Sequence, residues 1–365
     1  MSAAGKIWRT GWRFGLCALL LVWIFHSIFV NEARQRQGAA NFAQLPRAEQ
    51  WRQGWQIGPG ELARTLGNVR PGAFALSVVL MGVTVALGVA RWRLALRVQG
   101  LELSWGRANE ISLVAHFFNS FLLGATGGDL MKAYYAARET HHKKTEAALT
   151  VFVDRVIGLW AMLLFASVMM LFNFPLLFAH GGLRPLAGLI VALMIGCTGF
   201  LFLAFRGGVS RGWTGAREWL RRLPKGEWLE RALDSCRQFG RDPAFLWRAL
   251  VVSMTLNAFC VFQFVVLARG MNLAIAPVTL AVIVPIVICV AALPITPSGL
   301  GVRENLFVHL LAAKAVSVDA TSALSLSLLA YAGSLFWSLV GGGVYMLFKQ
   351  KHHLTETELA EERES

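Results

Sequence analysis

The stretch LPITPSGLGVRE, residues 293–304, interrupts an apolar run that begins near residue 277. Its prolines and glycines disfavour a continuous helix, because proline lacks a backbone N–H and glycine readily adopts turn conformations. Two ionisable residues, Arg303 and Glu304, follow directly, and such residues are costly inside a bilayer. The pattern predicts a helix that breaks within the membrane and a second helix that opens beside Arg303.

A second stretch, LLGATGGD at residues 122–129, has the same layout. It closes the apolar run 109–127, contains clustered glycines and places Asp129 directly after them. Irregular backbone is tolerated at membrane depth only where it is buried in protein or lines a cavity. Two such breaks, entered from opposite sides, are typical of the inverted repeats of transporters, whose sites lie at broken helices. The alternative interpretation is a pair of ordinary Gly/Pro-rich loops.

The composition identifies the environment in which this chain folds. Of its 365 residues, 56% are hydrophobic and only 15% are charged, against about 25% in soluble domains. With a mean hydropathy of +0.53, this indicates an integral membrane protein and excludes a soluble enzyme, a disordered chain and a disulfide-stapled secreted domain. The five cysteines are far apart and are expected to be small packing residues rather than metal ligands or disulfides: Cys17, Cys197, Cys236, Cys260 and Cys289.

The distribution of Lys and Arg indicates which apolar runs cross the membrane. A spanning helix needs about 20 apolar residues, and the candidate runs are 14–30, 73–97, 109–127, 147–172, 184–205, 248–269, 277–296 and 320–348. Cytoplasmic segments carry an excess of Lys and Arg, which accounts for the net charge of +14 without nucleic-acid binding. Most basic segments share one side only if both broken runs return to the side from which they enter. We therefore expect an all-α polytopic bundle with about six full spans, two re-entrant elements in an inverted repeat and both termini cytoplasmic.

Three parts of the chain are expected. Residues 1–72 contain an N-terminal span and an external segment with a short interfacial helix; the run 14–30 resembles a signal peptide, but no Ala-x-Ala site follows, which favours a retained span. Residues 73–350 form the membrane domain, and residues 351–365 form an acidic, disordered tail. The basic loop 206–248 is expected to lie as an amphipathic helix on anionic inner-surface headgroups, or else to be a solvated connector.

Ionisable residues beside the breaks or within a span are the candidates for a binding site. Arg303 opens a predicted helix whose unpaired N–H groups and dipole attract anions, and its guanidinium can grip a phosphate with two hydrogen bonds. Glu304 would complement the dipole or pair with an amine, and Asp129 would contact ligand or cap its helix. Asp154 and Arg155 are adjacent and point about 100° apart on a helix, so each needs another partner. For Arg155 the expected partners are Asp129 or a lipid phosphate.

Purely structural roles remain open for these residues. Arg303 and Glu304 could form a contact that only closes their loop, and Asp154 and Arg155 could form bridges between helices. The expected supporting positions are Lys132, His116, Asn119, Gly127, Gly128, Gly299 and Gly301. Lys132 is expected to snorkel towards the interface. His116 and Asn119 share a helix face, where interhelical hydrogen bonds are the alternative to a binding role.

Several short motifs resemble one known family. They are Arg91-Trp92-Arg93-Leu94 with Gln99-Gly100, Gly127-Gly128-Asp129 with Lys132-Ala133-Tyr134, Asp154-Arg155, and Leu293-Pro294-x-Thr296-Pro297-x-Gly299-Leu300-Gly301-Val302-Arg303-Glu304. They are similar to motifs of the lysylphosphatidylglycerol synthase transmembrane-region family of flippase-like proteins. The resemblance implies a membrane domain that moves an anionic or aminoacylated lipid between leaflets, or serves a lipid-linked glycan step. Two-domain members attach a soluble aminoacyl transferase; this sequence ends soon after its last predicted span, so we expect no lysine transfer by it alone.

The sequence thus predicts a multi-pass lipid translocase of the cell membrane in which Arg155 or Arg303 meets a headgroup phosphate. The alternative is an accessory membrane protein that binds lipid, or recruits an enzyme of envelope lipid or glycan synthesis, without moving lipid. No HExxH, Walker or GxSxG motif is present, so we expect no enzyme activity, cofactor or metal. The expected partners are membrane lipids, anionic inner-leaflet headgroups at the basic loop and, in the accessory case, an envelope-synthesis enzyme, but not nucleic acid.

Overall fold

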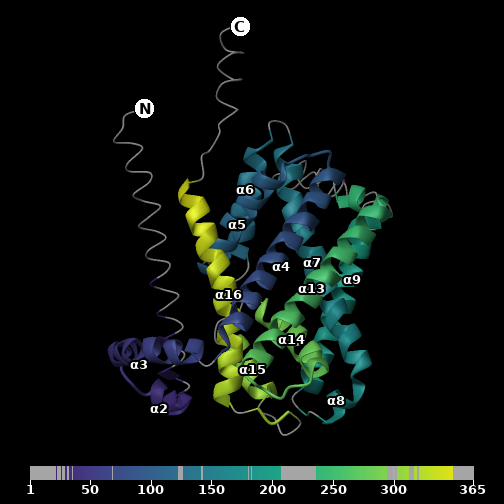
Figure 1. Cartoon of the computed structure of the whole chain (residues 1–365). Helices are drawn as coiled ribbons and strands as arrows, with labels where there is room; N and C mark the ends of the chain where they lie inside the picture. Colours follow the sequence, from purple (N-terminus) through teal and green to yellow (C-terminus); the bar gives the residue numbers. More distant parts are fainter. Residues whose placement is uncertain are drawn as a thin grey trace, which may run out of the picture.

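The fold of the protein is given by a computed structural model in which the chain forms α-helices (Figure 1). It describes residues 22, 26, 29–30, 33–34, 36–67, 69–121, 126–140, 143–179, 181, 183–206, 236–293, 299, 302–311, 316–318 and 320–347, and no strand occurs among them. The helices are α2 (Ala39–Ala43), α3 (Arg47–Gly67), α4 (Pro71–Val98), α5 (Trp105–Phe121), α6 (Thr126–Arg138), α7 (Lys144–Phe172), α8 (Phe174–Ala179), α9 (Leu183–Arg206), α13 (Pro243–Gly270), α14 (Pro277–Ala291), α15 (Val302–Leu311) and α16 (Ala320–Leu347). The all-α prediction is confirmed.

Within the described residues, five helices are long and apolar enough to cross a membrane: α4, α7, α9, α13 and α16. Large apolar side chains such as Phe202 on α9 and Val251 on α13 are exposed, as lipid-facing positions require. These helices correspond to five of the predicted full spans, so the chain is a multi-pass membrane protein. The first predicted span, 14–30, lies largely outside the described residues, as do most of the basic loop 206–248 and the tail 351–365.

The first break lies in a hairpin, α5 and α6, that returns to the end of the bundle at which it starts. At this end α4 finishes and α7 begins, and Lys143 Nζ donates a hydrogen bond to the backbone carbonyl of Gln99 at 3.0 Å. We call this the upper end, after its place in Figure 1, and the opposite end the lower end. The chain therefore enters and leaves the bundle on one side here, as the sequence predicts for the run 109–127.

The second break lies in the hairpin α14 and α15, at the lower end. α4 and α13 are antiparallel, because the backbone N–H of Arg70 donates to the carbonyl of Gly270 where α4 begins and α13 ends. α16 runs parallel to α4 (Figure 1), and the Trp337 indole N–H donates to the carbonyl of Val78 at 2.8 Å. Since α13 ends and α16 begins at the lower end, the intervening hairpin also returns to its own side.

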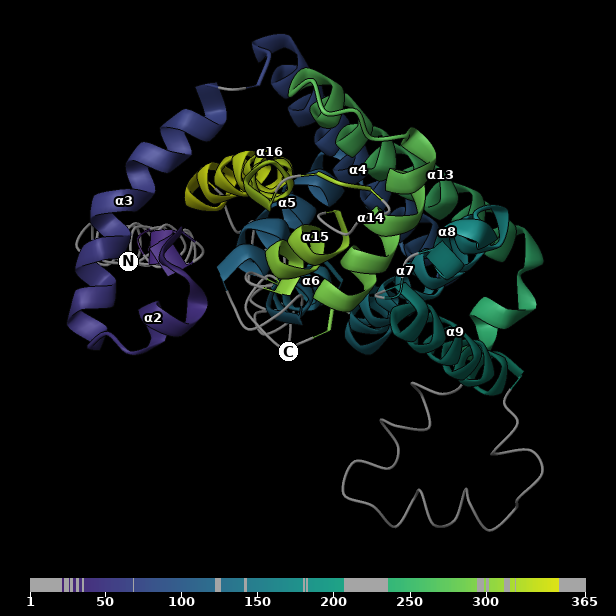
Figure 2. The same ribbon diagram turned by 90° about the horizontal axis from the view of Figure 1, so that it is seen from below.

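Two four-helix units, α4–α7 and α13–α16, share one pattern of neighbours. In each unit the two hairpin helices pack on each other, and the second of them packs on the last helix of its own unit. The first hairpin helix also packs on the last helix of the other unit, so α5 contacts α16 and α14 contacts α7. The equivalent helices α4 and α13 lie against each other (Figure 2). Because the hairpins enter from opposite ends, the units form an inverted repeat.

Close backbone contacts hold the upper hairpin in the bundle. A Cβ added at Gly341 of α16 would lie 2.1 Å from the backbone oxygen of Leu113 on α5, and one at the neighbouring Gly342 would meet the Phe117 ring at 2.9 Å. The lower hairpin instead joins a large apolar core with α7, α9 and α13. Small residues let helix backbones approach closely, which is the usual means of helix association in membranes.

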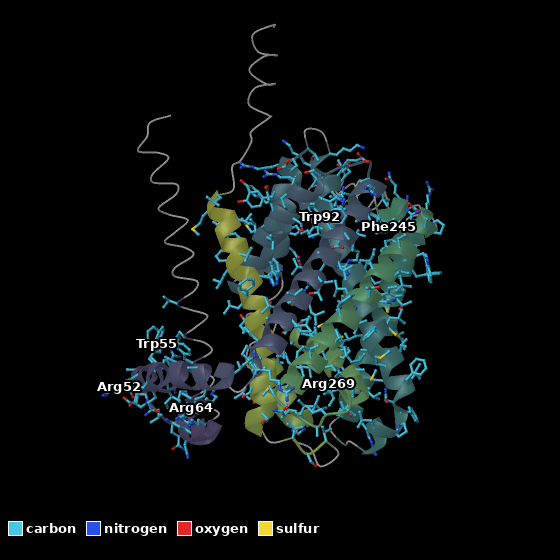
Figure 3. The ribbon with its side chains drawn as sticks, in the orientation of Figure 1. Arg52, Trp55, Arg64, Trp92, Phe245 and Arg269 are labelled. Atoms are coloured by element: carbon cyan, nitrogen blue, oxygen red, sulfur yellow. The ribbon has the colours of Figure 1, made fainter. Side chains whose placement is uncertain are left out.

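Helix α3 lies beside the lower part of the bundle and roughly perpendicular to the bundle axis (Figure 1). Arg52, Trp55 and Arg64 project from it (Figure 3), and the indole N–H of Trp55 donates to Nδ1 of His26 at 3.1 Å. Exposed tryptophans and arginines on a helix across the bundle axis suit the headgroup region, where indole rings are enriched. This is the geometry expected for an interfacial helix in the N-terminal part of the chain.

Gly341→Ala is expected to lower the melting temperature of the detergent-solubilised protein, because its methyl group meets a backbone oxygen that side-chain rotation cannot move away. Overpacking of this kind costs about 1–3 kcal/mol. The matched control is Gly343→Ala on the same helix, where an added Cβ meets nothing within 4 Å. Both substitutions favour helix formation to the same extent. Equal melting temperatures in the two variants would contradict the close contact between α5 and α16.

Candidate functional site

An aspartate within α7 is the centre of a group of charged residues inside the bundle. Asp154 lies ten residues, about 15 Å, from the first residue of α7. Its Oδ1 accepts a hydrogen bond from Nε of Arg91 on α4 at 2.7 Å, and its Oδ2 lies 3.6 Å from Nζ of Lys132 on α6. The three side chains are at most 13% exposed. One carboxylate therefore ties together a spanning helix, the upper hairpin and α7.

Further contacts fix the two cations in place. Nη1 of Arg91 donates to the hydroxyl of Ser253 on α13 at 3.1 Å, so the guanidinium also bridges the two units of the repeat. Lys132 Nζ lies 4.3 Å from the centre of the Trp92 ring, and the Trp92 indole donates to Thr150 on α7 at 3.1 Å. A cation over a buried indole gains electrostatic stabilisation from the ring face. Trp92 is fully buried in the upper part of the bundle (Figure 3).

Glycine leaves the room that the Arg91 side chain needs. A Cβ added at Gly158, one turn after Asp154 on α7, would lie 2.7 Å from the Arg91 guanidinium. A larger residue at this position would displace the guanidinium from the carboxylate that holds it. The face of α7 around Gly158 is thus part of the site, although glycine itself supplies no polar side chain.

Arg155 points away from Asp154, towards the edge of the site. Its Nε lies 3.5 Å from Oδ2 of Asp129, in the first turn of α6, and the two side chains are 45% and 28% exposed. We call Arg91, Asp129, Lys132, Asp154 and Arg155 the intramembrane cluster. The cluster combines three cations with two carboxylates, so in their usual charge states its members carry a net positive charge. Such an imbalance is costly in a low-dielectric region unless an anion completes it.

The glycine pair at the start of α6 brings the hairpin helices together. Oδ1 of Asn119 on α5 accepts from the backbone N–H of Gly128 at 2.8 Å, which satisfies one of the free donors of the helix N-terminus. A Cβ at Gly128 would lie 2.0 Å from the backbone oxygen of Ala115, so only glycine fits there. Gly127 is buried beside it. These three predicted supporting residues therefore close the hairpin tip from which Asp129 projects.

His116 joins the upper hairpin to α16. Its Nε2 lies 3.2 Å from the backbone oxygen of Ser334 and 3.4 Å from the hydroxyl of the same residue. One turn further, the Ser338 hydroxyl donates to the Ser120 hydroxyl at 2.8 Å. This is an interhelical hydrogen-bonded seam, which is the structural alternative for the polar residues of α5.

The second group of charged residues lies at the lower hairpin. Arg303 Nε, in the first turn of α15, donates to Oε1 of the adjacent Glu304 at 3.1 Å and to the Ser327 hydroxyl at 3.3 Å. The guanidinium also lies over the Tyr331 ring of α16, 4.5 Å from its centre. Glu304 is fully buried, and the Arg303 side chain is only 14% exposed. Gly299 precedes them with a φ of +68°, in the left-handed region that favours glycine.

The structure modifies several expectations for individual residues. α6 begins at Thr126, so Asp129 lies within its first turn and does not cap it. Lys132 pairs with Asp154 inside the bundle and does not reach for the interface. Arg155 lies beside Asp129, one of its expected partners, and Arg303 contacts Glu304, which is the structural alternative given for that pair. Gly301 lies outside the described residues.

Arg91 is a functional candidate that the sequence alone does not single out as a site residue. The basic pattern at the end of the run 73–97 places it among cytoplasmic flanking charges, although it lies seven residues before the end of α4. Its position inside the helix, on the face opposite Arg93, is the signal that could have identified it. Among the described residues, no group of three or more His, Cys, Asp or Glu side chains could hold a metal ion.

These spans and opposed hairpins define a polytopic α-helical membrane protein with an inverted repeat and charged side chains at both breaks. The family model of the lysylphosphatidylglycerol synthase transmembrane region matches residues 50–342, and the chain belongs to that family. The chain is also 24% identical over 293 residues to a UPF0104 membrane protein of Methanothermobacter thermautotrophicus, a match that covers 74% of this chain and 82% of that protein. The resemblance found in the sequence is thereby confirmed, and it associates the chain with membrane-lipid metabolism.

Asp154→Asn is expected to destabilise the protein more than Arg91→Gln. The first change leaves two buried cations without their carboxylate, and loss of one partner of a buried pair costs about 3–5 kcal/mol. The second change leaves Asp154 paired with Lys132. Thermal unfolding of both variants in the same detergent measures the difference. Equal losses would show that Lys132 contributes nothing to the pairing of Asp154.

Proposed function

We propose that this protein is a lipid translocase that moves an anionic or amino-bearing phospholipid, or a lipid-linked intermediate, between leaflets. The observation that carries the proposal is the intramembrane cluster, in which three cations face only two carboxylates at the tip of a re-entrant hairpin. Charged residues inside a membrane mark substrate pathways by default. A phosphodiester would bring the missing negative charge.

Arg155 is the member of the cluster best suited to meet a phosphate. Its side chain is 45% exposed, and its Nε is 3.5 Å from the nearest carboxylate oxygen, which is longer than a charge-assisted hydrogen bond. Arg91 and Lys132 are occupied by Asp154 and serve to position α4 and α6. The partly exposed carboxylate of Asp129 would then receive an amine of the same headgroup.

The inverted repeat supplies a reason for transfer between leaflets. The hairpins enter from opposite ends, and an arginine lies next to a carboxylate near each broken tip: Arg155 of α7 beside Asp129 of the upper hairpin, and Arg303 beside Glu304 in the lower one. In transporters with this architecture, the two units move relative to each other around sites at broken helices. The proposed translocase would expose the upper and the lower arginine in turn.

The remaining features of the function are part of the same proposal. The protein would act without enzyme chemistry, in the cell membrane, with the upper end and both termini on the cytoplasmic side, where basic residues accumulate. Its partners would be membrane lipids, with anionic headgroups at the basic loop 206–248. The accessory function stays the alternative, in which lipid or an envelope-synthesis enzyme is bound and no lipid moves.

Arg155→Gln is expected to slow the exchange of labelled phosphatidylglycerol in proteoliposomes by about tenfold or more, since one charge-assisted hydrogen bond to the phosphate is lost. Its melting temperature should stay close to that of the unmodified protein, because exposed ion pairs contribute at most about 1 kcal/mol. Arg269→Gln, at an exposed arginine in the last turn of α13 and outside the basic loop, is the matched control and should leave exchange unchanged. Equal rates in both variants would contradict the role of Arg155.

Arg303→Ala is expected to abolish exchange, because the lower arginine would no longer receive the headgroup. The change also leaves buried Glu304 without its guanidinium, so Arg303→Lys, which keeps the charge but loses the planar fork, is made alongside it. We expect reduced exchange in the lysine variant with normal folding. Unchanged exchange in a folded Arg303→Ala protein would overturn this role. Lipid binding without any exchange in the unmodified protein would favour the accessory function.

A further inference from the structure

A cavity lies at the upper end, outside the intramembrane cluster. Its volume is about 290 Å³, and its lining residues are Arg93, Arg97, Leu101, Glu102, Leu103 and Ser104. These residues come from the last turns of α4 and the short connection to α5. Two arginines one helical turn apart therefore share a concave surface with a single carboxylate.

The two arginines have hydrogen-bond donors to spare. Arg93 is held by a bond from its Nε to the Leu103 carbonyl at 3.0 Å and by stacking over the Trp105 ring, 4.3 Å from its centre. Both of its terminal nitrogens stay free of described partners. Arg97 is exposed, and no described residue forms a hydrogen bond or an ion pair with its side chain. Arg93 is thus fixed in orientation, whereas Arg97 is free to move onto a ligand.

The cavity lies at the level of lipid headgroups. α4 has 28 residues, whereas the hydrocarbon core of a bilayer needs about 20, so the last turns of α4 extend beyond the acyl chains. Trp105, at the start of α5, is 52% exposed beside the cavity, in the manner of an interfacial tryptophan. A phospholipid in this leaflet can therefore reach the cavity with its phosphate while its acyl chains stay beside the helices.

Charge and shape indicate the class of ligand. Two guanidinium groups and one carboxylate leave one positive charge, which a phosphodiester balances. We propose that this cavity is a separate binding site for the phosphodiester headgroup of an anionic glycerophospholipid in the upper-end leaflet. The Ser104 hydroxyl, which already accepts from the backbone N–H of Arg107 at 3.2 Å, is placed to donate to a phosphate oxygen.

The cavity site lined by Arg93 and Arg97 is distinct from the intramembrane cluster. Arg91 and Arg93 are two residues apart and therefore point about 200° apart around α4. Arg91 faces Asp154 and α13, whereas Arg93 faces the connection to α5. The proposal does not rest on lipid translocation, because a lipid can bind in this cavity whether or not the protein moves lipid between leaflets.

The test uses the full chain in phosphatidylcholine nanodiscs that contain a small fraction of photoactivatable phosphatidylglycerol. After irradiation, mass spectrometry quantifies the label on peptides spanning residues 93–107. Arg97→Gln is expected to reduce this labelling about tenfold, because a charge-assisted contact to the phosphate is lost. Arg138→Gln removes an exposed arginine at the end of α6, outside the cavity, and it should leave labelling unchanged.

Four results would overturn the proposal. Unchanged labelling in Arg97→Gln, or an equal loss in Arg138→Gln, would exclude a site built by this arginine. Equal labelling by photoactivatable phosphatidylcholine would exclude a preference for anionic lipid. Displacement by soluble glycerol phosphate as efficient as displacement by unlabelled phosphatidylglycerol would show a site for a free anion instead of a lipid. Exchange assays on Arg97→Gln separate this site from translocation, since the labelling result stands whether or not exchange occurs.

Discussion

The buried carboxylate of Asp154 is the interaction on which the upper half of the structure depends. It neutralises Arg91 of α4 and Lys132 of α6 from a position on α7, and Arg91 extends the link to Ser253 of α13. Without this carboxylate, two cations would face each other in an apolar bundle, where unpaired charge is strongly unfavourable. This one carboxylate thus fixes the charged face of α6 against α4 and α7.

The two units of the repeat share a backbone arrangement but not a chemistry. The upper hairpin carries polar side chains: His116 and Ser120 form hydrogen bonds with α16, and Asn119 forms one between the two hairpin helices. The lower hairpin begins with α14, which is almost wholly apolar and packs in the largest hydrophobic core. Hydrogen bonds along a polar helix interface can be re-formed with other partners when a helix shifts, whereas a closely packed apolar core resists such a shift. We therefore expect the upper hairpin to be the more adaptable of the two.

Much of the architecture could be predicted from the sequence, because the bilayer restricts what a chain can do. Length, apolarity and the Lys/Arg bias are sufficient to separate spanning helices from the two that return, and the glycine breaks locate both tips. The charged candidates Asp129, Asp154 and Arg155 follow from their cost in a membrane. Most of the partners of these residues cannot be predicted in this way, because pairing across helices depends on the rotation of each helix about its axis. From the sequence alone, Arg91 therefore looks like a flanking charge, and Lys132 is expected at the interface instead of beside Asp154.

Arg155 and Arg303 differ in exposure and in the number of interactions that hold them. Arg155 is 45% exposed and lies 3.5 Å from one carboxylate, whereas Arg303 is 14% exposed and is held by Glu304, Ser327 and the Tyr331 ring. A headgroup could reach the upper arginine with little rearrangement, but it would have to replace several interactions at the lower one. A ligand shifts a conformational equilibrium only by the difference in its affinity for the two states. The hydrogen bonds and the ring stacking that Arg303 would give up on opening must therefore be offset by a phosphate there, or by closure of the upper site. In the proposed translocase, this difference between an arginine on α7 and one on α15 is what alternating exposure of the two ends requires of any single state.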